Sequence, residues 1–385
     1  MVITTDSKRA RVALMIGHCA GMVDLVALPV WVGTLVAQYR FDAQQAGMLA
    51  SLFLVGAVLA SVALASRFDR LNVRLVATLG FGLAAIGFGY ASTLHDFTAL
   101  ALMHALCGMA SGAALSATHG TIARSGHPHR LFAIVGLALA VFGIVFMGAT
   151  PALVGQWGGA VLFQVFAGVM LVAALAAAWA FPVPDAVRSP APAGTRAPLS
   201  ASVWCGIVGI ACMGLVQAMT FSFLERVGSD RGFGAAAVTG VLIALGIVNL
   251  APPALAAWLE KRLAARSVLL GGAALQALLA CVIMLSTQFL PYALAASVFA
   301  AVMIFTHTFA FGLLARLDLS GRALAATPAM LMTGAAIGPV LGGTLVKSFG
   351  YGSLAIAAMA IAVVALLCFS RLPAAGAAPR HQAVA

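Results

Sequence analysis

The sequence predicts an all-α integral membrane protein in which twelve spanning helices form two parallel-related six-helix bundles. Three observations predict this fold class. The composition is too apolar for a soluble protein, because 63% of the 385 residues are hydrophobic, 8% are charged and the mean hydropathy is +1.08. A soluble domain carries roughly 25% charged residues. The apolar residues also form blocks of membrane-spanning length, and landmarks of the first half recur in the second.

The apolar blocks are long enough to cross a hydrocarbon core of about 30 Å, which takes roughly 20 helical residues. They lack the alternating pattern of barrel strands, and isolated strands would leave backbone groups unpaired in lipid, so each block is predicted to be a helix. The first block is too long for a cleaved signal peptide and is expected to be the first membrane helix. The predicted spans are 11–37, 44–66, 73–92, 97–123, 131–152, 158–181, 201–225, 233–257, 267–286, 289–314, 323–346 and 350–370.

The net charge of +11 indicates the orientation of the chain in its membrane. Of the 21 lysines and arginines, only Arg40, Arg226, Arg231 and Lys347 fall at the span ends opposite the N-terminus, and the other 17 fall on the N-terminal side. The positive-inside rule therefore places both termini in the cytoplasm. We expect a multi-pass monomer of the cell inner membrane whose basic residues face the lipid surface and bind no nucleic acid.

The sequence shows no pattern for a cofactor, a metal or a catalytic centre. The six cysteines lie within apolar blocks at no zinc or redox spacing, which favours a packing role. There is no phosphate-binding loop G-x-x-x-x-G-K-[ST], so ATP is not the expected source of energy.

A proline-rich polar stretch at 182–200 divides six predicted helices from six. We therefore predict an N-terminal bundle at 1–181, a cytoplasmic linker at 182–200, and a C-terminal bundle with a short cytoplasmic tail at 201–385. Arg124 and Arg316 are among the landmarks that recur with an offset of 192 residues. Because each half has an even number of helices, the two halves are related by an axis along the membrane normal, which suits alternating access.

The turn between the second and third spans carries a recognisable motif. It reads ASRFDRLNVR at 65–74, and its Asp69, Arg70 and Arg74 match the pattern G-x-L-x-D-R-x-G-R-[RK], while both glycines and one arginine of the pattern are missing. With twelve spans in two parallel halves, the chain resembles a transporter of the major facilitator superfamily over essentially its whole length. The resemblance implies an ionic latch, in which acidic and basic side chains form ion pairs in one conformation and separate in another. Its expected members are Asp69, Arg70, Arg74, Glu260, Arg124 and Arg316.

Asp24 is the one acidic residue predicted in mid-membrane. It lies 13 residues beyond Arg11, which is roughly 20 Å of helix. A carboxylate at that depth costs at least a few kcal/mol, so we expect it to be functional. Desolvation disfavours its charged form, which makes Asp24 a candidate proton carrier at the interface of the bundles, with His104 at similar depth as its predicted partner. The alternative use of Asp24 is as the counter-charge of a cationic substrate.

The resemblance implies that spans 1, 4, 7 and 10 line a central cavity, while spans 3, 6, 9 and 12 face lipid. Gln217 corresponds to the depth of Asp24 through the 192-residue repeat, and Gln276 is one of few polar residues on the spans expected to face lipid. Glu225 and Arg226 are interpreted either as a solvated pair or as an external gate. The predicted substrate contacts are His18, Trp31, Gln217, Phe221 and His307.

No lysine or arginine is predicted in mid-membrane, which disfavours a strongly anionic substrate. We expect a proton-coupled secondary transporter of a small neutral, cationic or weakly anionic organic solute. Efflux is slightly favoured, because G-x-x-x-G-P-x-x-G-G at 334–343 resembles the antiporter motif that the family has in span 5, although 143–151 carries only a degraded copy. The alternatives are proton-symport uptake of an organic metabolite, a non-transporting membrane sensor, and a membrane enzyme.

Overall fold

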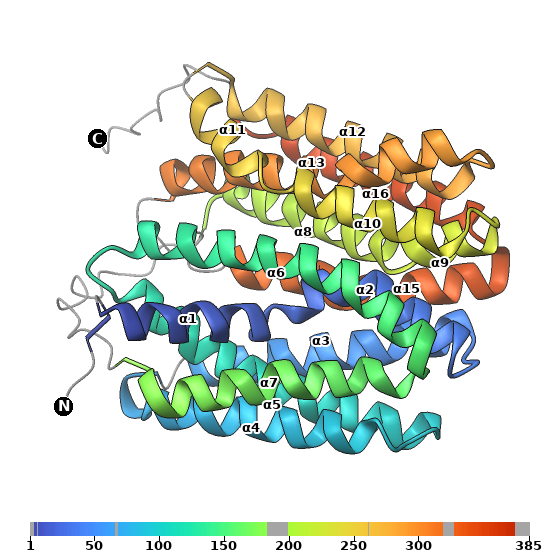
Figure 1. The fold of residues 1–385 in the computed structure, drawn as a ribbon. Coiled ribbons are helices and arrows are strands. Elements are labelled where there is room, and N and C mark those ends of the chain that lie inside the picture. Colours follow the sequence, from blue (N-terminus) through green and yellow to red (C-terminus); the bar gives the residue numbers. More distant parts are fainter. Residues whose placement is uncertain are drawn as a thin grey trace, which may run out of the picture.

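The protein consists of helices that lie roughly parallel to one another (Figure 1). The computed structural model describes residues 4–5, 7–65, 68–182, 199–260, 262–318 and 327–373, and contains no strand in these ranges. Within them, twelve segments are long and apolar enough to cross a membrane. Because α1 begins and α16 ends at the same end of the bundle, we call this the inner end and the opposite one the outer end.

The first half holds spans 1 to 6, and the first of these consists of two helices. A short 3-10 turn, η1 (Phe68–Arg70), joins spans 2 and 3. The helices are α1 (Lys8–Gly21) and α2 (Val23–Ala37), α3 (Ala43–Ala65), α4 (Val73–Ala91), α5 (Phe97–Ala123), α6 (Pro128–Trp157) and α7 (Ala160–Ala180).

The second half holds spans 7 to 12, and its first two spans are each made of two helices. They are α8 (Ala201–Ser222) with α9 (Leu224–Asp230), α10 (Ala235–Val248) with α11 (Pro252–Leu259), α12 (Ala265–Leu285), α13 (Phe289–Leu317), α15 (Thr327–Phe349) and α16 (Gly352–Ser370).

All twelve predicted spans are confirmed, and their described ends differ from the prediction by a few residues; the predicted end at 66 and the predicted start at 323 lie outside the described residues. The helices begin at local signals that the sequence contains. The side chains of Ser7, Asn72, Asp96 and Ser200 each accept the N–H of the residue three positions on, which satisfies one of the unpaired donors at a helix start. The clearest differences are span 5, which continues past the predicted end at 152 to Trp157, and span 7, which continues past 225 to Asp230.

The same contact recurs in both halves at the predicted repeat distance. Arg74 at the start of α4 donates to the carbonyl oxygen of Ala178 at the end of α7. Arg266 at the start of α12 donates to the carbonyl oxygen of Ser370 at the end of α16, at 2.7 Å. Both residues of the pair are displaced by 192, so the two halves share a register as well as a helix count. Residues 183–198 lie outside the described ranges, and the boundaries at 182–200 stay a prediction.

Spans 1 and 7 are the most enclosed. In their most apolar 18-residue stretches, 78% and 67% of the residues are buried, whereas the share is at most 44% in the other described spans. Both are interrupted at one residue with nearly the same backbone angles. Met22 separates α1 from α2 with φ −107° and ψ 19°, and Phe223 separates α8 from α9 with φ −106° and ψ 4°. Each interruption is followed two residues later by an acid, Asp24 or Glu225.

Candidate functional site

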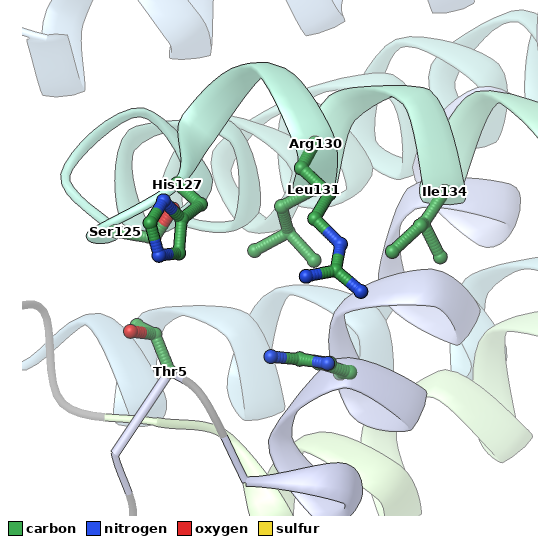
Figure 2. A pocket seen from close by; sticks show the side chains of 7 residues that line it. Thr5, Ser125, His127, Arg130, Leu131 and Ile134 are labelled. Atoms are coloured by element: carbon green, nitrogen blue, oxygen red, sulfur yellow. The ribbon is translucent and has the colours of Figure 1, made fainter.

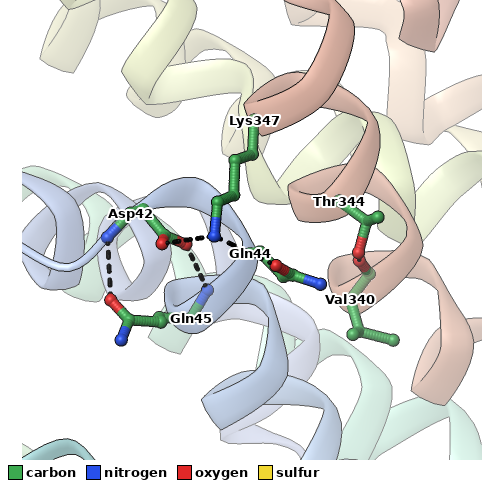
Figure 3. Close-up of polar contacts among 6 residues, drawn as sticks. All are labelled: Asp42, Gln44, Gln45, Val340, Thr344 and Lys347. Atoms are coloured by element: carbon green, nitrogen blue, oxygen red, sulfur yellow. Dashed lines mark hydrogen bonds and ion pairs between the residues drawn. The ribbon is translucent and has the colours of Figure 1, made fainter.

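Polar contacts join the two halves at the outer end, where α3 meets α15 (Figure 3). The Lys347 ammonium lies 2.8 Å from Asp42 Oδ2 and donates to Gln44 Oε1 at 3.2 Å. The Val340 N–H donates to Ser51 Oγ at 3.1 Å. These contacts fasten the outer ends of spans 2 and 11 to one another.

The environment of Asp42 stabilises its charged form. Partial burial acts to raise the pKa of this carboxyl, but the hydrogen bond and charge of Lys347, together with the backbone N–H groups of Gln44 and Gln45, outweigh burial and hold the pKa below its ordinary value. The ion pair is therefore formed at neutral pH.

Glycines allow the backbones of α3 and α15 to touch along this seam. A Cβ added at Gly47 would lie 2.0 Å from the carbonyl oxygen of Pro339, and one added at Gly343 would lie 2.1 Å from that of Ala43. Another glycine of α15, Gly334, packs as closely against α8. The small residues at 334–343 thus permit the close approach that their spacing predicts.

At the inner end, the central helices present apolar surface toward the opposite half. Helix α1 packs on α5, α6 and α7 of its own half, and α8 packs on α13, α15 and α16 of its own half. The side chains that these neighbours leave uncovered include Val12 (49% exposed) on α1, and Trp204 (54%) and Val208 (40%) on α8. The halves are therefore joined where α3 meets α15, and these apolar side chains stay exposed toward the inner end.

Asp24 is buried beside the interruption of span 1, with 7% of its surface exposed. It lies in the first turn of α2, next to its own backbone N–H and that of Leu25. The N-terminus of a helix has unpaired N–H groups and a positive dipole end, both of which favour a negative charge. The interruption at Met22 thus creates, inside the bilayer, a local environment suited to a carboxylate.

Helical periodicity places Asp24 on the face of α2 that also carries Trp31. Trp31 lies two turns further along α2 on the same face and is completely buried, with ring contacts to Phe53 and Phe166. Leu25, on a different face, is 45% exposed. Asp24 therefore lies on the side of span 1 that packs into its own half.

Contacts between span 1 and α5 define a regular antiparallel register. Trp31 bonds to His104, and a Cβ at Gly21 would meet the Leu115 side chain at 2.7 Å. Interpolation between these contacts places Asp24 level with Ser111. The Ser111 hydroxyl is buried and has no hydrogen-bond partner within the described part of the chain.

His104 has both ring nitrogens engaged and is completely buried. Its Nδ1 donates to the Leu100 carbonyl oxygen at 2.6 Å, and its Nε2 accepts from Trp31 Nε1 at 3.2 Å. This arrangement requires the neutral ring. No hydrogen bond or ion pair between His104 and Asp24 is found among the described residues, so the predicted pair is not formed in this conformation.

His18 and His119 form a histidine pair that the sequence analysis did not predict. His18 Nδ1 lies 2.9 Å from His119 Nε2, between α1 and α5, and inward of Asp24. One N–H can be shared between the two nitrogens, so one ring donates and the other accepts. The antiparallel register of spans 1 and 4 is the signal that could have found it.

Gln217 is bonded within the second half. Its Oε1 accepts from Gln276 Nε2 at 3.1 Å, and the same nitrogen donates to the Met213 carbonyl oxygen at 3.2 Å. Gln276 is 1% exposed, so the expectation that the polar residues of span 9 face lipid was wrong at this position. A buried amide needs partners, and Gln217 supplies one.

The remaining predicted contacts lie apart from Asp24. His307 Nδ1 donates to the Met303 carbonyl oxygen at 2.9 Å, and its ring centroid lies 5.0 Å from that of Phe311. Trp31 and Phe221 are 0% and 4% exposed, so both pack in the core in this conformation.

The expected latch residues make different contacts in the two halves. Arg316 lies 3.4 Å from Glu260, and because both side chains are mostly exposed the pair is weak. The Arg124 guanidinium lies 4.3 Å from the Phe68 ring centroid. Arg70 is exposed and has no hydrogen bond or ion pair to another described residue. The side chain of Asp69 is outside the described part of the chain.

A small basic hollow at the inner end lies away from Asp24, between α1 and α6 (Figure 2). Arg11, Arg130 and His127 line it, and its volume of about 10 Å³ has room for about one water molecule. It is too small for an organic solute. No three metal-ligating side chains come together in the ranges that the structure describes.

Comparisons with known proteins agree with this architecture. The family model of the Major Facilitator Superfamily matches residues 13–320. A stretch of 173 residues is 31% identical to the 4-hydroxybenzoate transporter PcaK of Pseudomonas aeruginosa and covers 43% of this chain, but it spans only 37% of that relative.

Three solved structures of similar fold cover nearly the whole chain. A D-xylose-proton symporter has a TM-score of 0.76 at 14% identity and covers 95% of this chain and 98% of its own. The nucleoside transporter NupG has a TM-score of 0.73 at 14% identity, and the match covers 94% of this chain and 98% of NupG. A bacterial homolog of the human lysosomal transporter Spinster, in an inward-facing and unoccupied conformation, has a TM-score of 0.71 at 14% identity. The match covers 94% of this chain and 96% of that homolog. The chain belongs to the Major Facilitator Superfamily, a family of membrane transporters.

Proposed function

We propose that the chain moves a small organic solute across the inner membrane by alternating access, driven by the proton gradient. The observation that carries this proposal is the single buried carboxylate at the interruption of span 1. Asp24 has no counter-ion among the described residues, and burial costs its charged form more than its neutral form. It can therefore take up and release a proton as the conformation changes.

Asp24 is proposed as the proton site, and the exposed faces of the central helices as the path of the solute. Leu25 on α2 and Trp204 and Val208 on α8 are exposed apolar side chains of the two central spans. His307, with only one ring nitrogen engaged in a described contact, is a polar group that a solute could bind. An apolar path with few polar groups suits a small, weakly polar solute.

The first solutes to test are aromatic monocarboxylates. The relative from Pseudomonas aeruginosa is a 4-hydroxybenzoate transporter, and a weakly anionic aromatic acid agrees with the apolar path and with the lack of a mid-membrane cation in the sequence. The direction favoured slightly is efflux, with uptake by proton symport as the alternative. The positive-inside distribution supports an inner end in the cytoplasm.

The test combines ligand binding and flux. A thermal-shift series of the purified protein with 4-hydroxybenzoate, a pentose and a nucleoside identifies the solute class, because a ligand of the folded state raises the thermal midpoint. Proteoliposomes with an imposed pH gradient then measure accumulation of that solute. Asp24→Asn is expected to abolish gradient-driven accumulation and to keep solute binding.

Asp96→Asn is the matched control, since Asp96 is an exposed helix cap at the outer end. Its transport should equal that of the wild type. Unchanged accumulation and unchanged pH dependence in Asp24→Asn would refute the proton site.

A further inference from the structure

A second acid, Glu225, lies where the two halves meet. It is in the first turn of α9, the short outer helix of span 7, and α9 packs against α2 of the first half. A Cβ added at Gly33 of α2 would lie 1.8 Å from Glu225 Oε2. The absence of a side chain at Gly33 is therefore what lets the carboxylate touch the opposite half.

Helix α9 is fixed to its own half, so this contact depends on how the halves are placed. Tyr292 of α13 donates to the Leu224 carbonyl oxygen at 2.8 Å. Tyr351 donates to Asp230 at 2.5 Å, and Arg231 donates to the carbonyl oxygens at the end of α12, including that of Ile283 at 3.1 Å. Separation of the halves at the outer end would move Glu225 away from Gly33 as one body with α9.

Among the described residues, the Glu225 carboxylate has one hydrogen-bond partner, the Ser229 hydroxyl, which donates to Oε1 at 2.8 Å. The adjacent Arg226 pairs instead with Asp230, and no ion pair joins Glu225 to a described cation. Glu225 and Arg226 therefore form no ion pair with each other, and Glu225 lies at the seam.

Few titratable or charged groups face Glu225. Arg226 and Asp230 of its own helix and Tyr292 of α13 are the ones close enough to act on it. Helix α2 carries only Asp24, nine residues from Gly33, and α10 carries none. The cysteines of α8, and Arg266 and Cys281 of α12, make no hydrogen bond or ion pair with Glu225, and Arg231 donates to carbonyl oxygens of α12 instead. The described part of the opposite half therefore supplies no cation that forms an ion pair with Glu225 Oε2.

We propose that Glu225 is a proton-binding site that controls closure of the outer end. Closure places Oε2 against the Gly33 backbone and shields it from part of the solvent, leaving the Glu225 side chain half-buried. An anion loses hydration there without gaining an ion pair across the seam, because Arg226 pairs with Asp230, whereas the protonated acid is neutral. Protonation therefore favours the closed seam and loss of the proton favours its opening. This inference rests on the proposed proton-driven transport and adds the group that ties proton binding to the conformational change.

The test measures closure directly, without solute or flux. In a variant whose six native cysteines are replaced, spin labels on Thr93→Cys in the first half and Thr287→Cys in the second report the width of the outer end. Both positions are exposed and lie in loops at that end. Between pH 8 and pH 5 the ratio of closed to open protein should rise about tenfold in the parent. In Glu225→Gln, which mimics the neutral acid, the outer end should be closed at both pH values.

A second measurement uses the chain with its native cysteines. Hydrogen exchange of the segments 33–42 and 340–347 is compared between the wild type and Glu225→Gln at the same pH, so that the intrinsic effect of pH cancels. The variant should be better protected at pH 8 and equal to the wild type at pH 5. Ser229→Ala keeps the acid and should keep the pH dependence.

A wild type whose outer end is insensitive to pH, or a Glu225→Gln variant that retains the wild-type response, overturns the proposal. Asp24→Asn separates it from the proposed function, because that variant should lose gradient-driven accumulation and keep pH-dependent closure. If Asp24→Asn removes the response of the outer end and Glu225→Gln does not, the proton that controls closure is on Asp24 and the proposal fails.

Discussion

The two central spans are interrupted alike but place their acids in different surroundings. Span 1 breaks at Met22, and Asp24 faces the interior of the first half. Span 7 breaks at Phe223, and Glu225 lies against Gly33 of the other half. Opening of the outer seam would separate Glu225 from Gly33.

This difference separates two tasks that proton-driven transport requires. A carboxylate enclosed by one rigid half can hold its proton while the halves move. A carboxylate covered only when the halves touch changes its preference for a proton with the conformation, and by reciprocity its proton changes the conformation. The comparison predicts that substitutions around Asp24 alter the stability of the first half, while substitutions along the seam alter the balance between conformations.

The largest expected effect is on the stability of the first half, at His104, which accepts a hydrogen bond from Trp31. His104→Ala removes a buried ring and leaves the Trp31 indole N–H without its acceptor. Loss of packing and an unsatisfied donor together should lower the free energy of unfolding by about 3 kcal/mol or more. The measurement is the thermal midpoint of the purified protein, with His95→Ala, an exposed outer-loop histidine, as control.

The response of the outer end to pH should be unchanged in His104→Ala, since both ring nitrogens serve local hydrogen bonds. If the variant instead loses gradient-driven accumulation while its thermal midpoint stays at the wild-type value, His104 shares the proton of Asp24 and the structural role given to it here is wrong.

The next effect concerns the seam between α3 and α15. Gly47→Ala would place a methyl group 2.0 Å from the Pro339 carbonyl oxygen, and backbone atoms cannot move aside as a flexible side chain can. The closed outer end should lose about 1–3 kcal/mol relative to the open one. Label distances between the halves measure this shift.

Gly82→Ala is the matched control for the seam, because a Cβ there meets nothing within 4 Å. It should leave the conformational balance unchanged. An outer end that stays fully closed in Gly47→Ala would show that the two helices do not need this close contact.

The smallest expected effect is at the exposed ion pair of the outer end. Asp42→Asn removes the pair with Lys347, whose side chains are 38% and 47% exposed, so solvent screens it and the closed state should lose only about 0.5 kcal/mol at pH 7. Label distances at low and high salt measure this loss, and high salt should reduce the difference between variant and wild type.

The pH dependence of this pair has the opposite sign to that of Glu225. The pKa of Asp42 is held below its ordinary value of 3.8, so the contribution to closure is complete above that value and is lost as the pH falls through the lowered pKa. Asp42→Asn should therefore leave the response between pH 8 and pH 5 intact. A response that disappears in this variant would transfer the control of closure from Glu225 to Asp42.

The helices could be predicted from the sequence because each apolar block satisfies its own backbone hydrogen bonds, whatever its neighbours are. The 192-residue offset is visible in single residues such as Arg124 and Arg316, and it reappears in the matched contacts of Arg74 and Arg266. Asp24 was identifiable for a similar reason, because depth along a helix follows from counting residues.

The interruptions and the direction of each side chain could not be predicted in this way. Neither Met22 nor Phe223 is a glycine or a proline, so no local signal marks the breaks. The contact of Glu225 with Gly33 joins residues 192 positions apart, and the bond between Gln217 and Gln276 turns a residue expected at the lipid into a buried one.

The sequence by itself determined the membrane class, the twelve spans, the twofold repeat and the rarity of acids in mid-membrane, since these depend on length, polarity and spacing along one chain. Only the tertiary structure decided that Asp24 faces its own half, that His104 serves Trp31, and that Glu225 lies at the seam. The physical reason is that the environment of a buried polar group is set by the helices packed around it, and helix packing is a property of pairs of surfaces rather than of any one segment.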